Sequence, residues 1–82
     1  MTADDLKTIV VEELINIAPE FEAEEIDPDA DLREEMDIDS MDFLNFVIAL
    51  HKKLSVDSPE ADYPQLFTVN GAVGYLAAKS AG

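Results

Sequence analysis

The chain has 82 residues, of which 19 are acidic and 5 are basic, and it contains no cysteine. A chain of this length forms one domain, residues 1–82, and the missing cysteine excludes disulfides, thiolate nucleophiles and thiolate metal sites. The net charge of −14 also disfavours binding to nucleic acid or to anionic membranes.

The negative charge lies almost entirely in the first half. Residues 1–42 hold 16 of the 19 acids against only Lys7 and Arg33, whereas residues 43–82 are neutral overall. Such a field favours basic protein surfaces as partners, although acidity also keeps a small protein soluble. No apolar run approaches the roughly 18 residues of a membrane span, and the start MTADDLK lacks the basic segment of a signal peptide. We therefore expect a cytoplasmic monomer.

Residues 2–17 are predicted to form the first helix. Thr2 and Asp5 have the spacing of a capping box with a shortened acid, and Ala18-Pro19 ends the helix because proline disfavours helical backbone in the residue before it. The apolar residues recur at helical spacing and are Leu6, Ile9, Val10, Leu14 and Ile17.

A long connection, residues 18–39, follows. Loops of this length in a compact domain are usually functional, and its spaced apolar residues predict that it is pinned to the core: Phe21, Ile26, Leu32 and Met36. Its stretch DPDADLREEMDI resembles a calcium loop, but Leu32 replaces the turn glycine and Ile38 the bidentate glutamate. We expect no structural calcium site, while weak screening by divalent cations stays open.

Residues 40–54 are predicted to form the second helix, with Ser40 as its N-cap and Asp42 in the first turn. Lys52 and Lys53 suit its C-terminal end. Its apolar residues surround almost the whole circumference, so part of this surface is expected to face cargo or a partner.

After Ser58-Pro59, residues 61–67 are predicted to form a short helical turn, and Thr68 is expected to cap a last helix. Val69, Ala72, Val73 and Leu76 share one face of it, while Gly71 and Gly74 each cost about 1 kcal/mol relative to alanine. The predicted fold is all-α: a small bundle of three main helices plus one short helix.

Ser40 raises the question of catalysis. A nucleophilic serine needs a base within hydrogen-bonding reach, and the only histidine, His51, lies eleven residues further along the same predicted helix, about 16 Å away. His51 is expected at the surface. A helix N-terminus favours an attached anion, so attachment explains Ser40 better than catalysis does.

The residues resemble those of the acyl carrier protein family. The similarity rests on DSMD (residues 39–42), FVIALHKKL (46–54), the loop around Pro59 and the last helix from Thr68. It implies a non-catalytic carrier in which a phosphopantetheinyl transferase attaches 4′-phosphopantetheine to Ser40 from coenzyme A. Asp39 and Met41 would border this site, and the arm's thiol would hold acyl groups as thioesters.

The resemblance also suggests roles for other residues of this helix. Phe46, Val47 and Leu50 are candidates to line an acyl chain, or they are ordinary core. Docking of acyl-transferring or acyl-elongating enzymes with basic patches is expected to use four residues: Asp37, Asp42, Leu44 and Ile48. Two alternatives are a peptidyl or aminoacyl carrier, and a helical adaptor without a prosthetic group that docks through its acidic loop and Met41, Leu44 and Ile48.

Two features depart from the family pattern. Asp37 stands where the family usually has glycine, so the loop must manage without a permissive backbone. The second helix is also less acidic than in carriers of general fatty-acid synthesis, because it contains Asn45, His51, Lys52 and Lys53. We therefore expect a stand-alone carrier of fatty-acid or specialised lipid or polyketide synthesis, with cognate enzymes of its own.

Overall fold

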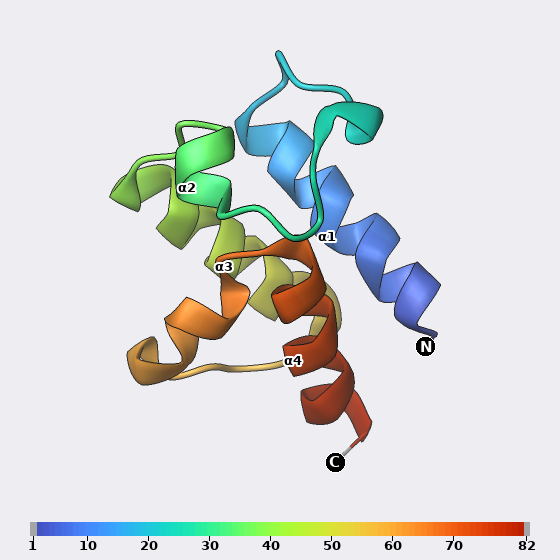
Figure 1. Ribbon diagram of the computed structural model, residues 1–82. Coiled ribbons are helices and arrows are strands. Elements are labelled where there is room, and N and C mark those ends of the chain that lie inside the picture. The colour runs from blue at the N-terminus through green and yellow to red at the C-terminus, as the bar shows by residue number, and fades with distance from the viewer. Residues whose placement is uncertain (1, 82) are drawn as a thin grey trace.

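The computed structural model describes residues 2–81, and all the regular secondary structure in that range is helical (Figure 1). Three long helices form the bundle: α1 (Ala3–Ile17), α3 (Ser40–Leu54) and α4 (Val69–Ala81). Three short segments complete it: η1 (Ala23–Glu25), α2 (Leu32–Glu35) and η2 (Glu60–Leu66). The all-α prediction is therefore confirmed, with three short helical segments in place of the one expected.

The first helix begins as its sequence predicts. The Thr2 hydroxyl accepts a hydrogen bond from the Asp5 amide at 3.1 Å, and the Asp5 carboxylate accepts one from the Thr2 amide at 3.3 Å. This capping box satisfies two amides that the helix leaves without a partner. Helix α1 then packs against both α3 and α4, burying Leu6, Val10 and Leu14.

The connection between α1 and α3 is held against the bundle, as predicted. Ile26, Leu32 and Met36 are buried and Phe21 is partly buried. Backbone hydrogen bonds tie it to the start of α4: Leu32 donates to the Phe67 carbonyl at 2.7 Å, and Asn70 donates to the Pro28 carbonyl at 2.9 Å. These bonds place α2 beside the end of η2, next to the start of α3 (Figure 1).

The last helix is capped by Thr68, whose hydroxyl accepts from the Gly71 amide at 2.9 Å. Its buried residues Val69, Ala72 and Leu76 belong to the predicted face, and Val73 is partly buried. Among the residues whose burial is described, sixteen buried apolar residues between Leu6 and Leu76 form the core, so the long helices are stabilised mainly by burial of their apolar faces.

Candidate functional site

Ser40 is the first residue of α3 and is exposed. The predicted cap was wrong by one residue: the N-cap is Asp39, whose carboxylate accepts a hydrogen bond from the Asp42 amide at 2.8 Å. Both residue types cap helices well, but Asp39 has the extended backbone that a cap requires. Because Asp39 accepts the capping hydrogen bond, the Ser40 hydroxyl is not needed to cap α3.

The turn before α3 contains a left-handed residue. Asp37 has φ 52°, a conformation that glycine adopts freely and that costs other residues about 1–2 kcal/mol. The loop therefore keeps the backbone shape of a glycine turn without the glycine. Aspartate is among the residues that tolerate this region best.

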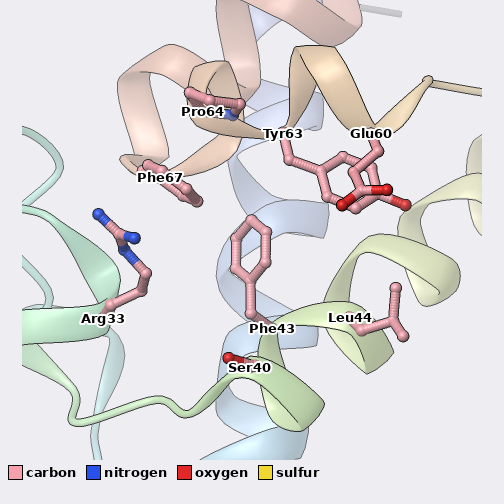
Figure 2. Close-up of a pocket in the computed structure, with 8 residues that line it drawn as sticks. All are labelled: Arg33, Ser40, Phe43, Leu44, Glu60, Tyr63, Pro64 and Phe67. Atoms are coloured by element: carbon pink, nitrogen blue, oxygen red, sulfur yellow. The ribbon is translucent and has the colours of Figure 1, made fainter.

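A pocket of about 520 Å³ opens beside Ser40. Its wall is formed by α2, α3 and η2, through Arg33, Ser40, Phe43, Leu44, Glu60, Tyr63, Pro64 and Phe67. Figure 2 shows Phe43 near its centre, with Ser40 at its base, Arg33 and Phe67 on one side and Tyr63 and Glu60 on the other. An arm attached to Ser40 would leave the helix directly beside this pocket.

Aromatic rings make up most of the apolar surface of the pocket. The Phe43 ring lies 5.2 Å from Phe67 and 6.1 Å from Tyr63, measured between centroids, both in edge-to-face contact. Such pairs add about 0.5–1.5 kcal/mol beyond the area they bury, so the rings form a firm apolar wall. The pocket can hold an apolar or flat group next to the Ser40 hydroxyl.

Arg33 is the only positive side chain in the pocket wall. Its Nε and Nη2 donate to the Asp31 carboxylate at 3.1 and 2.8 Å, and its guanidinium lies 3.7 Å from the centroid of the Phe67 ring. The hydrogen bonds from Arg33 lower the pKa of Asp31. Sequence reasoning missed this residue, although it is the only arginine of the chain and one of two cations in the acidic half.

The residues proposed to line an acyl chain lie elsewhere. Phe46, Val47 and Leu50 are 0–1 % exposed, and they belong to the packed core rather than to the wall of the pocket. Their role towards cargo stays a prediction, since a chain would reach them only if α3 moved away from its neighbours.

One face of α3 carries exposed apolar side chains. Met41 is 69 % exposed, Leu44 40 % and Ile48 39 %, an unusual exposure for large apolar residues in so small a domain. Their spacing of three and four residues places them on one stripe of the helix, which begins next to Ser40. Asp37 is exposed and Asp42 half-buried at the same end.

His51 does not approach Ser40. It lies near the other end of α3, and its Nε2 is 2.5 Å from the hydroxyl of buried Ser58. The prediction of a surface histidine was wrong, because the side chain is only 20 % exposed. Nearby, the Tyr75 hydroxyl donates to Asp62 at 2.6 Å, and burial raises the pKa of Tyr75 to about 12, with the hydrogen bond to Asp62 adding to the shift.

Three aspartates of the calcium-like stretch, residues 27–38, form hydrogen bonds and an ion pair within the protein. The Asp27 carboxylate accepts from the Asp29 amide, Asp29 accepts from the Asn70 side chain, and Asp31 pairs with Arg33. Among residues 2–81, no group of three or more such side chains is placed to hold a metal ion. Within the same range, no helix combines the length and apolarity needed to cross a membrane.

The chain is similar to known proteins in both sequence and fold. The family model for a phosphopantetheine attachment site matches residues 4–76. The acyl carrier protein of Helicobacter hepaticus is 31% identical over 77 residues, covering 94% of this chain and 95% of that protein. That of Wolinella succinogenes is 33% identical over 73 residues, covering 89% and 90%. In structure, the chain is similar to an acyl carrier protein from Enterococcus faecalis, with a TM-score of 0.83 at 22% identity, covering 98% of this chain and 100% of that one.

Proposed function

Because this chain belongs to the acyl carrier protein family, we propose that Ser40 carries its 4′-phosphopantetheine arm and that the chain acts as a stand-alone acyl carrier in the cytoplasm. Members of this family are carriers and not enzymes. The arm supplies the chemistry, since its terminal thiol holds the acyl group as a thioester. The protein's own task is to present the arm to partner enzymes and to shield what it carries.

One observation carries the assignment of Ser40. Its hydroxyl is exposed at the first residue of α3, where a transferase can reach it without unfolding the domain, and it borders the aromatic pocket. Asp39 and Met41 flank it on the exposed surface. Asp39 holds the helix end in shape, while the highly exposed Met41 offers the transferase an apolar contact.

Intact mass measurement tests this assignment. The apo-protein is incubated with coenzyme A, magnesium and a broad-specificity phosphopantetheinyl transferase. We expect one phosphopantetheine adduct on the wild type and none on Ser40→Ala. Ser55→Ala is the matched control, because Ser55 is an exposed serine beyond the other end of α3, and it is expected to react fully. A wild type that gains no mass would point to an adaptor, and an adduct on Ser40→Ala would place the arm elsewhere.

The aromatic wall of the pocket favours a hydrocarbon acyl cargo over a peptidyl one. The wall carries Phe43, Tyr63 and Phe67, with Arg33 and Glu60 as its two charged side chains. A peptide brings several amides, which lose hydration against aromatic rings, whereas a hydrocarbon chain or ring loses only unfavourable contact with water there. An aminoacyl cargo stays the alternative, because its ammonium would face Glu60 and the rings.

Partner enzymes are proposed to dock on the exposed face of α3. The stripe of Met41, Leu44 and Ile48 supplies apolar contact, and Asp37 and Asp42 attract a basic patch at its start. Lys52 extends the stripe at its other end, because it follows Met41 by eleven residues, close to three full turns. A cognate partner would thus present basic groups near Ser40 and an acidic group about 18 Å along the helix, opposite Lys52.

A pair of charge reversals tests this docking proposal. Lys52 lies on the stripe, whereas Lys53, also exposed, is turned about 100° away from it. The wild-type carrier is expected to be a poor substrate for a reconstituted bacterial fatty-acid synthase whose docking surfaces are basic. Lys52→Glu should raise the kcat/KM of the synthase enzymes for this carrier about fivefold or more. The reason is that it removes the repulsion between Lys52 and the basic docking surface, which is worth at least about 1 kcal/mol. Normal elongation on the wild type, or an equal gain from Lys53→Glu, would contradict the proposal.

A further inference from the structure

Attachment of the arm creates an electrostatic problem at Ser40. A phosphodiester is an anion, and it would join a segment that already carries Glu34, Glu35, Asp37, Asp39 and Asp42. The helix start offers less compensation than usual, because the Asp39 carboxylate already occupies the Asp42 amide. A positive side chain close to the attachment point would offset part of this repulsion.

Arg33 is placed to supply this charge. Residues 1–42 contain two basic side chains, Arg33 and Lys7. Arg33 shares the wall of the pocket with Ser40, whereas Lys7 lies on α1 and borders a different hollow together with Thr8, Val11 and Ala23. Figure 2 shows Arg33 at the side of the pocket with its guanidinium directed toward Phe67, and Ser40 at the base of the same pocket.

The guanidinium of Arg33 is held in place with part of its hydrogen-bonding capacity unused. Asp31 fixes one edge through two hydrogen bonds, and the Phe67 ring supports its face at 3.7 Å. Both of these hydrogen bonds use Nε and Nη2, so the Nη1 amino group takes no part in the pairing with Asp31. An arginine has five N–H donors in a rigid fork, so a second anion can bind at the open edge while Asp31 stays in place.

We propose that Arg33 binds the phosphate of the arm and so holds the arm against the pocket. This inference rests on the proposed attachment to Ser40. Arg33 is a positioning residue: it neutralises the phosphodiester locally and directs the arm along the Phe43–Phe67 wall, instead of leaving it free in solvent. A lysine at this position would supply a point charge but neither the stacking on Phe67 nor the two-sided fork.

Phosphorus NMR of the modified protein tests the proposal. Wild type, Arg33→Gln and Lys7→Gln are each modified with coenzyme A and a broad-specificity transferase, and the adduct is verified by intact mass. Both variants remove one positive charge from an exposed side chain, so both should fold. We expect the transverse relaxation rate of the phosphodiester ³¹P signal to fall by roughly a third in Arg33→Gln, as for a group whose order parameter drops from about 0.85 to below 0.6. Lys7→Gln should leave it unchanged.

A second measurement needs no variant. The Arg33 Nε–H resonance of the wild type should shift between the unmodified and the modified protein, and the Lys7 side-chain resonances should not. Equal ³¹P relaxation in all three modified proteins, or an unshifted Arg33 resonance, would overturn the role of Arg33. The phosphopantetheine adduct on the wild type would still support the carrier assignment in that case. A wild type without an adduct would overturn both.

Discussion

Replacing the two glycines of α4 by alanine should have opposite effects on stability. Gly71 lies in the first turn of α4, and a Cβ there would stand 2.6 Å from the Gln65 carbonyl oxygen and 2.8 Å from the Thr68 hydroxyl. The first of these atoms belongs to the backbone of η2, and the second caps α4. A Cβ on Gly74 would meet no atom within 4 Å.

The magnitudes follow from these distances. Alanine in place of glycine inside a helix stabilises by about 1 kcal/mol, and at Gly74 nothing opposes that gain. At Gly71 the new methyl group overpacks against η2, which typically costs about 1–3 kcal/mol, and displacing Thr68 loses a cap worth about 1 kcal/mol. Gly71→Ala should therefore lower the free energy of unfolding by about 1–3 kcal/mol, whereas Gly74→Ala should raise it by about 1 kcal/mol.

Urea and thermal unfolding measured under identical conditions provide the assay. In a domain of this size about 1 kcal/mol moves the Tm by roughly 4–8 °C, so the two variants should melt at clearly separate temperatures on either side of the wild type. Unchanged m-values would show that the unfolded states are comparable. Equal shifts in the same direction would show that helix propensity alone decides both positions and that the contact with Gln65 is not limiting.

Three further outcomes are expected. Asp37→Gly should be more stable than Asp37→Asn by up to about 1 kcal/mol in urea unfolding, because both remove the charge but only glycine relieves the left-handed backbone; equal stabilities would show that Asp37 is not strained. The pKa of Tyr75 is raised from 10.0 to about 12 in the folded protein, so this tyrosine stabilises the fold below about pH 10, and the contribution is lost as the pH rises through that window. The free energy of unfolding of the wild type, measured by urea unfolding between about pH 10 and 12, should therefore fall by more than that of Tyr75→Phe. Finally, adding salt at low ionic strength should raise the Tm, because sixteen acids in the first half repel one another; a flat Tm would contradict this.

The sequence predicted the long helices well because their signals are local. Capping residues and apolar spacing placed α1 and α3 to within a residue. The exact cap of α3 was missed, since Asp39 and Ser40 are both good caps and only the backbone angles distinguish them. The short helix α2 was missed as well, because four residues are too few to show periodicity.

The pocket depends on contacts that no local pattern contains. Arg33 and Phe67 are far apart in the chain and meet because backbone hydrogen bonds join the connection to the start of α4. The partial burial of His51 likewise depends on the contact of its ring with Ser58, which lies beyond the end of α3. Arg33 could still have been singled out by its charge, as an isolated cation among acids around a proposed anion.

The apolar side chains of helix α3 lie in three different places. Phe46, Val47 and Leu50 enter the core, Phe43 forms the pocket, and the stripe that includes Leu44 faces outward. Access of cargo to the first group would require separating α3 from α1, against which it packs, and losing the contacts of a large core side chain typically costs about 3–5 kcal/mol. The aromatic pocket offers apolar surface without that rearrangement. If Ser40 carries the arm as proposed, we expect a short acyl group to lie in the aromatic pocket beside it, where a partner enzyme can take it without opening the bundle.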